Sequence, residues 1–182
     1  MKGDRVKICT IGAKNFRTLE NFSLDLRPNY CAISGQNNAG KSAIVRIIQF
    51  FFDHRDDDPF FARMSRSITF AKDSTQWLQA PELQISVEVE LDRKDDSEVF
   101  FVAETYRQDP IEGDSVRIYL SQLMSSDGSG KLTCLVGDKE LDGQKASEVL
   151  KKFRSASNLV VHNSTNPARN IYYLASGHTE VM

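Results

Sequence analysis

The chain has 182 residues, 40% of them hydrophobic and 26% charged, which are the proportions of an ordinary globular domain. No stretch approaches the roughly 18 consecutive apolar residues that a membrane-spanning helix needs, so a transmembrane protein is excluded. With 23 Lys and Arg against 25 Asp and Glu, the formal net charge is −2, and no overall positive field draws the chain toward nucleic acid.

The N-terminal segment nevertheless has a local excess of positive charge. Before Glu20, only Asp4 opposes five basic residues, which are Lys2, Arg5, Lys7, Lys14 and Arg17. This segment is either a local contact for DNA or a solvated strand face. The three cysteines form no Cys-x-x-Cys pair, and the first ten residues lack the apolar run of a signal peptide. We therefore expect a cytoplasmic protein.

Alternating apolar residues predict an antiparallel pair of strands at residues 6–11 and 22–26, joined by a polar connection over residues 12–21. A short buried strand is expected at residues 30–34, after the turn at Pro28 and Asn29.

A helix is predicted for residues 42–53, because apolar side chains recur there at helical spacing. The stripe consists of Ile44, Ile47, Ile48 and Phe51. The acidic run that follows, residues 53–59, favours a solvated loop over a site for a divalent ion, because nothing fixes the geometry of its carboxylates.

The second half of the chain is predicted to form an antiparallel β-meander with short turns at Asp95, Gly113 and Gly128. Its expected strands are residues 82–92, 97–107, 115–124 and 132–136. An amphipathic helix at residues 145–154 and a brief strand at 158–161 follow. Trp77 is expected in the core of this lobe, with an anchor for a partner surface as the alternative.

The segment GQNNAGKS fits the phosphate-binding pattern G-x-x-x-x-G-K-[ST], and it stands between a predicted strand and a predicted helix. Glycines at both ends let consecutive amides point into one concavity, and the helix start adds its positive dipole end. Lys41 is placed to reach between the β- and γ-phosphates of a nucleotide, and the Ser42 hydroxyl is a ligand for Mg²⁺. The predicted binding residues are Gly35, Gln36, Asn37, Asn38, Ala39, Gly40, Lys41, Ser42 and Ala43.

A small GTPase is the first alternative for such a loop. It would need a D-x-x-G motif after an apolar strand and an N-K-x-D guanine reader. The segment DGSG at residues 127–130 reads instead as a hairpin tip. In VGDKELD, residues 136–142, Asp138 replaces the asparagine and Leu141 takes the place of the carboxylate. The GTPase reading is therefore disfavoured.

Residues 5–52 resemble the opening of the ABC-type ATPase heads of SMC, RecF and OLD-family proteins. The resemblance lies in the order of the segments: a strand, then KNFRTLENFSLDL, then a second strand that leads into GQNNAGKSAIVRIIQFFF. The resemblance implies a mixed α/β P-loop fold, with a central sheet plus an antiparallel β-meander lobe. It implies ATP as the ligand and places Asn15, Phe16 and Arg17 near the nucleotide. It also implies that two heads enclose ATP between the P-loop of one and a signature segment of the other, as in a homo-oligomer.

Within these relatives the OLD group is the closest in appearance, because a modest β-rich insertion follows the helix instead of a long coiled coil. The segment NLVVHNST then takes the place of the family's Q-loop, without its glutamine. His162 or Asn163 could position water or metal there, although a strand end capped by polar side chains is the favoured reading.

Two expected motifs are missing. No apolar run ends in Asp-Glu, so the Walker B carboxylates are absent, and no LSGG-like signature is present. We therefore expect the N-terminal portion of a longer ATPase, incomplete at its C-terminus and either truncated or one half of a split protein. An OLD protein would carry a Toprim nuclease domain further downstream. The expected divisions are 1–53 for the P-loop core, 54–81 for a connection with a short helix, 82–136 for the β lobe, 143–165 for a helix and strand returning to the core, and 166–182 for a tail.

These observations predict an ATP-binding half of an ABC/OLD-like ATPase module that gates an attached nuclease or DNA-processing activity, in antiphage defence. Its expected partners are the remainder of the ATPase, a second head and a Toprim nuclease, with DNA contacted indirectly. Two alternatives stay open: a RecF- or SMC-like DNA-repair ATPase head, and a nucleotide-sensing module that does not hydrolyse ATP.

Overall fold

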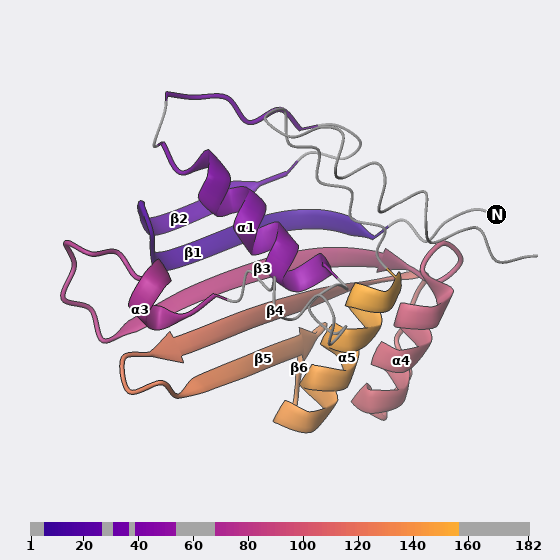
Figure 1. The fold of residues 1–182 in the computed structure, drawn as a ribbon. Coiled ribbons are helices and arrows are strands. Elements are labelled where there is room, and N and C mark those ends of the chain that lie inside the picture. Colours follow the sequence, from indigo (N-terminus) through magenta and orange to yellow (C-terminus); the bar gives the residue numbers. More distant parts are fainter. Residues whose placement is uncertain (1–5, 27–30, 37–38, 54–67, 157–182) are drawn as a thin grey trace, which may run out of the picture.

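A computed structural model describes residues 6–26, 31–36, 39–53 and 68–156, and in these ranges one antiparallel sheet of six strands dominates (Figure 1). Its strand order is β2-β1-β3-β4-β5-β6, and each neighbouring pair is antiparallel. The strands are β1 (Lys7–Phe16), β2 (Leu19–Asp25), β3 (Glu82–Asp92), β4 (Ser115–Ser125), β5 (Gly130–Val136) and β6 (Lys139–Leu141).

Alternation along β3 decides which face of the sheet is buried. Every second residue from Leu83 to Leu91 is almost completely buried, and the residues between them are partly exposed. Val87 of β3 lies opposite Leu120 of β4, and this pair continues the same apolar face. A strand with this period has one face toward a core and one toward solvent. The prediction of a strand at residues 82–92 is confirmed.

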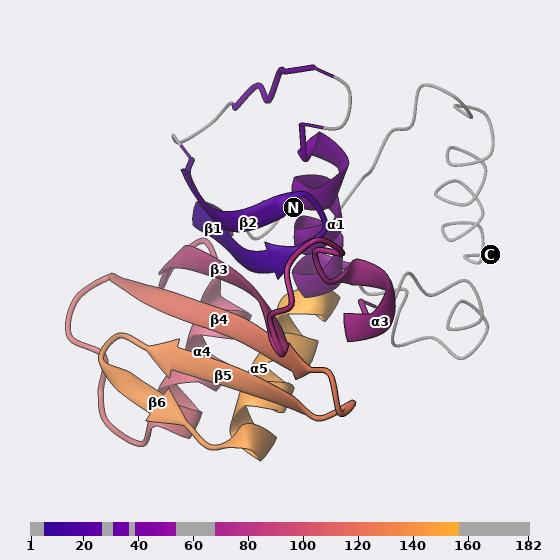
Figure 2. The same cartoon turned by 90° about the vertical axis from the view of Figure 1, so that its left-hand side faces the viewer.

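Three helices cover the apolar face: α1 (Lys41–Phe52), α4 (Ser97–Arg107) and α5 (Gly143–Ala156). Figures 1 and 2 show them lying on the same side of the sheet. The helix predicted from the apolar stripe is confirmed as α1, and its Ile44, Ile47 and Phe51 are buried. The ring of Phe52 meets that of Phe153 of α5 edge to face, with 6.2 Å between centroids. The second predicted helix is confirmed as α5.

The prediction of a strand at residues 97–107 is wrong, because this segment is the helix α4. Its five consecutive apolar residues, Val99 to Ala103, carry no period of two or of 3.6, so periodicity gave no reason to prefer a strand to a helix. The structure buries Val99 and Phe100 together, which a strand with one exposed face cannot do. The helix ends at Gln108, which has a left-handed φ of 65°.

Arg93 fastens α4 to the end of β3. Its guanidinium lies over the ring of Phe100, 4.5 Å from the centroid, and its Nη2 donates to Glu104 Oε1 at 3.1 Å. A backbone hydrogen bond from the Ile111 amide lowers the pKa of Glu104, and the bond from Arg93 lowers it further. The pair Arg93 and Glu104, 11 residues apart in the chain, thus holds the helix in place.

Other local predictions also need correction. The predicted strand at residues 30–34 is wrong for residues 31–34, which are exposed and form no strand. They pair with none of the described strands, so no inter-strand hydrogen bonds stabilise an extended backbone there. β1 continues to Phe16, so the predicted connection over residues 12–21 shrinks to the turn at Arg17 and Thr18. Gly12 serves close strand packing, since a Cβ there would lie 2.4 Å from Ser86 Oγ. The short strand β6 was not predicted.

A one-turn helix, α3 (Phe70–Asp73), lies within the predicted connection. The strand expected at residues 158–161 and the acidic run after Asp53 lie outside the described residues.

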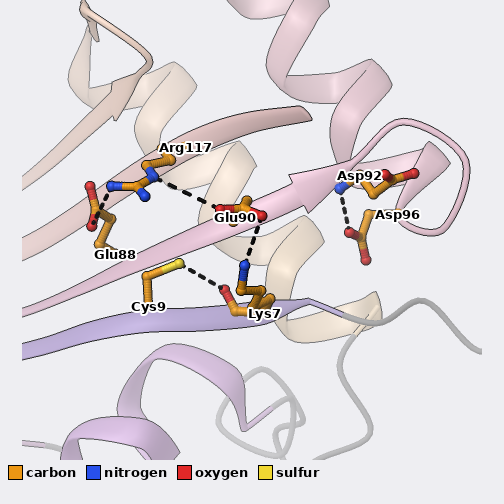
Figure 3. Close-up of polar contacts among 7 residues, drawn as sticks. All are labelled: Lys7, Cys9, Glu88, Glu90, Asp92, Asp96 and Arg117. Atoms are coloured by element: carbon orange, nitrogen blue, oxygen red, sulfur yellow. Dashed lines mark hydrogen bonds and ion pairs between the residues drawn. The ribbon is translucent and has the colours of Figure 1, made fainter. Parts of the chain in front are cut away.

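The opposite face of the sheet is polar, and Figure 3 shows its charged cluster. Lys7 Nζ lies 2.9 Å from Glu90 Oε1, and Arg117 approaches Glu88 at 3.7 Å and Glu90 at 3.9 Å. The hydrogen bond to Glu90 raises the pKa of Lys7. Two basic residues of the N-terminal segment thus have acidic partners, because Arg17 pairs with Asp73. For Lys7, which lies in β1, the pairing favours the solvated strand face over a contact for DNA.

No helix within the described ranges is both long enough and apolar enough to cross a membrane.

Candidate nucleotide-binding site

The helix α1 begins at the phosphate-binding motif, where Gly35, Gln36 and residues 39–42 are described. Gly40 is the N-cap, with φ +87°, and its carbonyl accepts hydrogen bonds from the amides of Ala43 and Ile44. No side chain caps this helix end, and its first turn contains no acidic residue. The first helical amides and the positive end of the dipole therefore remain available to an anion from outside the helix.

Gly40 is also in close contact with the turn between β1 and β2. A Cβ at this position would lie 2.6 Å from Leu19 Cδ2 and 3.2 Å from Thr18 Oγ1. Only glycine combines the left-handed φ with this close approach. The turn at Arg17 and Thr18 is thus placed directly beside the start of α1.

Lys41 folds back over the loop that precedes it. Its Nζ donates to the carbonyl oxygen of Gly35 at 2.6 Å and to that of Gln36 at 2.5 Å. Both acceptors are neutral carbonyl oxygens, whereas an ammonium group binds charged oxygens more strongly. A phosphate at the loop would therefore compete with these carbonyls for the Lys41 ammonium. Ser42 is exposed at the second position of the helix, where its hydroxyl is accessible to a ligand.

The site thus offers an uncapped helix start, a glycine that lets the turn approach, an ammonium group and an exposed hydroxyl. These features fit the binding of a nucleoside triphosphate. Asn37 and Asn38 lie outside the described residues, as do His162 and Asn163. Among the side chains that are described, no group of three or more His, Cys, Asp or Glu could hold a metal ion by itself.

The three residues Asn15, Phe16 and Arg17 differ in their surroundings. The Asn15 amide donates to the Glu82 carbonyl at 2.7 Å and accepts from the Thr75 amide at 3.1 Å, so both ends of this buried side chain are engaged. Phe16 is fully buried in the core. Arg17 lies in the turn with φ 54°, and its Nε donates to Asp73 Oδ1 at 2.8 Å. Of the three, Arg17 has the side chain that is accessible near the loop.

Four neighbours of this site were missed at the sequence level: Thr18, Leu19, Arg46 and Asp73. Thr18 and Leu19 directly follow the Asn-Phe-Arg element, so the resemblance could have been extended to them. Asp73 lies in a segment without any recognisable pattern, 56 residues after Arg17. No sequence signal pointed to it.

Trp77 is 60% exposed, and the prediction that it lies in the core of the lobe is wrong. Its Nε1 donates to Glu20 Oε1 at 2.5 Å, which fixes the indole beside the start of β2. The indole N–H thus has a hydrogen-bond partner although the ring lies at the surface.

The two segments weighed for a GTPase are tight turns. Gly128 has φ +84°, and the Ser129 amide donates to Asp127 Oδ1 at 2.8 Å. Hydrogen bonds from Ser129 lower the pKa of Asp127. Asp138 pairs with Arg107 at 2.9 Å between β5 and β6. The antiparallel pairing of β4 with β5, in which Met124 lies opposite Gly130, confirms the hairpin reading of residues 127–130.

The mixed α/β fold and its loop at the helix start define a P-loop nucleotide-binding ATPase domain. A profile of the AAA ATPase domain family matches residues 6–179, so the chain belongs to that family. No curated protein sequence matches the chain.

Solved structures of SMC ATPases share the fold. A structure from work on ATP-driven dimerization and DNA stimulated activation of SMC ATPases has a TM-score of 0.55 and 15% identity, over 91% of this chain and 90% of that one. A SmcHead bound to the C-winged helix domain of ScpA has a TM-score of 0.50 and 19% identity, over 82% and 41%. The structure of the recombination mediator RecF with ATP has a TM-score of 0.48 and 14% sequence identity. The match covers 79% of this chain and 30% of that one. The chain thus spans less than half of the SmcHead and RecF chains.

Proposed function

We propose that this chain is the Mg-ATP-binding half of an ABC/OLD-like ATPase module, whose nucleotide state gates an attached nuclease or DNA-processing activity in cytoplasmic antiphage defence. The observation that carries the proposal is the start of α1. There, an uncapped helix end, the left-handed Gly40 and the Lys41 ammonium converge on one loop.

The residues of the loop have separate roles in binding. The first amides of α1 bind the phosphate oxygens, and Lys41 exchanges its carbonyl partners for charged oxygens. Ser42 would hold Mg²⁺, which supplies neutralisation of the phosphate charge when bound. Arg17 lies in the turn beside Gly40 and supports the proposal that the Asn-Phe-Arg element contacts the nucleotide.

Gating would follow from additional contacts that the γ-phosphate makes between two heads, since a ligand shifts an equilibrium only by its differential affinity for the two states. The signature segment and the Walker B carboxylates would come from the remainder of the ATPase, and a Toprim nuclease is the proposed effector. The fold shared with an SMC ATPase studied for ATP-driven dimerization supports the closure of two heads.

A RecF- or SMC-like DNA-repair head is the second candidate, and the similarity to the SMC ATPase over 91% of the chain favours it. A nucleotide-sensing module that does not hydrolyse ATP is the third, favoured by the lack of an apolar run ending in Asp-Glu. Phosphate release by this chain would exclude the third candidate, because turnover requires a catalytic carboxylate that such a module lacks.

Calorimetric titration with ATP, ADP and GTP in the presence of Mg²⁺ tests the proposed binding. We expect ATP to bind and Lys41→Ala to weaken it by about 10- to 100-fold, the effect of removing a hydrogen bond to a charged group. Lys131→Ala is the matched control, since this lysine pairs with Glu140 at the surface. Preference for GTP, or equal affinity of Lys41→Ala and the wild type, would contradict the proposal.

A further inference from the structure

Asp73 is a fully buried carboxylate that binds groups from three separate segments. Its Oδ1 accepts from Arg17 Nε at 2.8 Å and lies 3.4 Å from Arg46 Nε, and its Oδ2 accepts from the Thr69 amide at 3.0 Å. A buried charge is tolerated only when opposite charges and donors surround it, and these contacts supply both.

The two arginines come from the two elements that form the candidate site. Arg17 is in the turn that contacts Gly40, and Arg46 is the sixth residue of α1, five positions after Lys41. The backbone strengthens the link, because the Arg17 amide donates to the Asp73 carbonyl at 2.7 Å. A single side chain therefore fixes the turn and the helix relative to each other.

Asp73 also determines how Arg17 is presented. It binds Arg17 through Nε, and the guanidinium carbon lies 5.9 Å from the centre of the Phe16 ring. Within the described ranges, Asp73 is the only hydrogen-bond acceptor of this side chain, so both Nη groups are left for another ligand. The Arg17 side chain is 38% exposed, whereas Asp73 is inaccessible. One edge of the guanidinium is thus anchored, and the other can bind two oxygens of a phosphate.

We propose that Asp73 is a positioning residue for triphosphate binding: it holds Arg17 beside the start of α1 so that the free Nη edge binds the phosphate chain. This inference rests on the proposed function. Asp73 itself touches no ligand and acts through Arg17. Because Asp73 already holds the Arg17 side chain in place, less side-chain entropy is lost when the phosphate binds.

A double-mutant cycle tests the role of Asp73. The variants are Asp73→Asn, Arg17→Ala and their combination, with affinities for Mg-ATP and for inorganic triphosphate measured by calorimetry. We expect each single variant to weaken both ligands by about tenfold, because the affected contacts are with phosphate. The double variant should be no weaker than Arg17→Ala alone, since Asp73 acts only through that arginine.

Asp138→Asn is the matched control, because this aspartate lies in the turn between β5 and β6 and pairs with Arg107 at the end of α4. It should leave the affinity unchanged. If Asp73→Asn does not fold, as judged by circular dichroism, Arg17→Lys replaces it. A lysine can pair with Asp73 but has no second donor edge, so it should retain the thermal stability and lose the affinity.

The outcomes separate this inference from the proposed function. Absence of ATP binding by the wild type overturns the proposed function. The role of Asp73 is overturned by a different set of results. In that set, the wild type binds ATP, Lys41→Ala binds it weakly, and Asp73→Asn or its substitute Arg17→Lys binds ATP like the wild type. Additive losses in the double variant overturn it as well, because Asp73 would then act independently of Arg17.

Discussion

At the scale of single residues, Gly40 is constrained twice, by its φ of +87° and by the contact with Leu19. Gly113 has almost the same φ, +89°, but nothing lies within 4 Å of the Cβ it would gain. Gly113→Ala should therefore cost about 1–2 kcal/mol from backbone strain alone. Gly40→Ala should lower the free energy of unfolding by more than this. It should also lower the affinity for ATP, because the start of α1 must move. Urea unfolding and calorimetry measure the two effects, and equal costs at both positions would contradict the steric argument.

Cys134 gives a prediction about alkaline pH. Burial raises the pKa of this thiol from 9.0 to about 12. Between these values the unfolded chain loses the proton and the folded chain keeps it, so its contribution to the free energy of unfolding is full below pH 9 and falls as the pH rises. The slope reaches at most about 1.4 kcal/mol per pH unit. Urea unfolding from pH 8 to 11 should show a flatter decline for Cys134→Ala than for the wild type. Parallel declines would contradict this assignment.

At the scale of elements, two adjacent phenylalanines of α4 test the helix that replaced a predicted strand. Phe100 is 1% exposed and Phe101 is 67% exposed. Phe100→Ala should lower the free energy of unfolding by about 3–5 kcal/mol through the cavity it creates. Phe101→Ala should change it by less than about 0.5 kcal/mol, as expected at the surface. Chemical denaturation of both variants provides the measurement, and similar losses would contradict the burial seen here.

The elements that could be predicted are those with an unambiguous period. β3 alternates without interruption, and α1 and α5 each bury one helical stripe. α4 could not be predicted because its apolar residues are consecutive, and its identity depends on packing against β3 and α5. The short β6 owes its pairing to β5, which a run of three residues cannot reveal.

At the scale of the whole molecule, binding at one loop should stabilise the entire fold. A ligand that binds only the folded state at 100 times its Kd adds about 2.7 kcal/mol to the free energy of unfolding. We therefore expect Mg-ATP to raise the Tm of the wild type and to raise that of Lys41→Ala by clearly less at the same concentration. Differential scanning calorimetry gives both values. A rise of equal size in the variant would place the ligand elsewhere.

The candidate site was predictable only in its local part. The residues from Gly35 to Ser42 form a contiguous motif, so their proximity is set by the chain itself. Asp73 approaches Arg17 because Ser74 pairs with Phe16 at the end of β1, and this pairing arises only in the folded sheet. Contacts of this kind depend on strand register over long separations, for which a single sequence carries no signal.

The position of Trp77 has a practical consequence for spectroscopy. It is the only tryptophan of the chain, it is bound to Glu20, and Glu20 follows the pair that touches Gly40. The emission of the protein above the tyrosine band therefore originates from one known indole, next to the turn that borders the phosphate loop. An optical signal from this neighbourhood needs no dye and no engineered label.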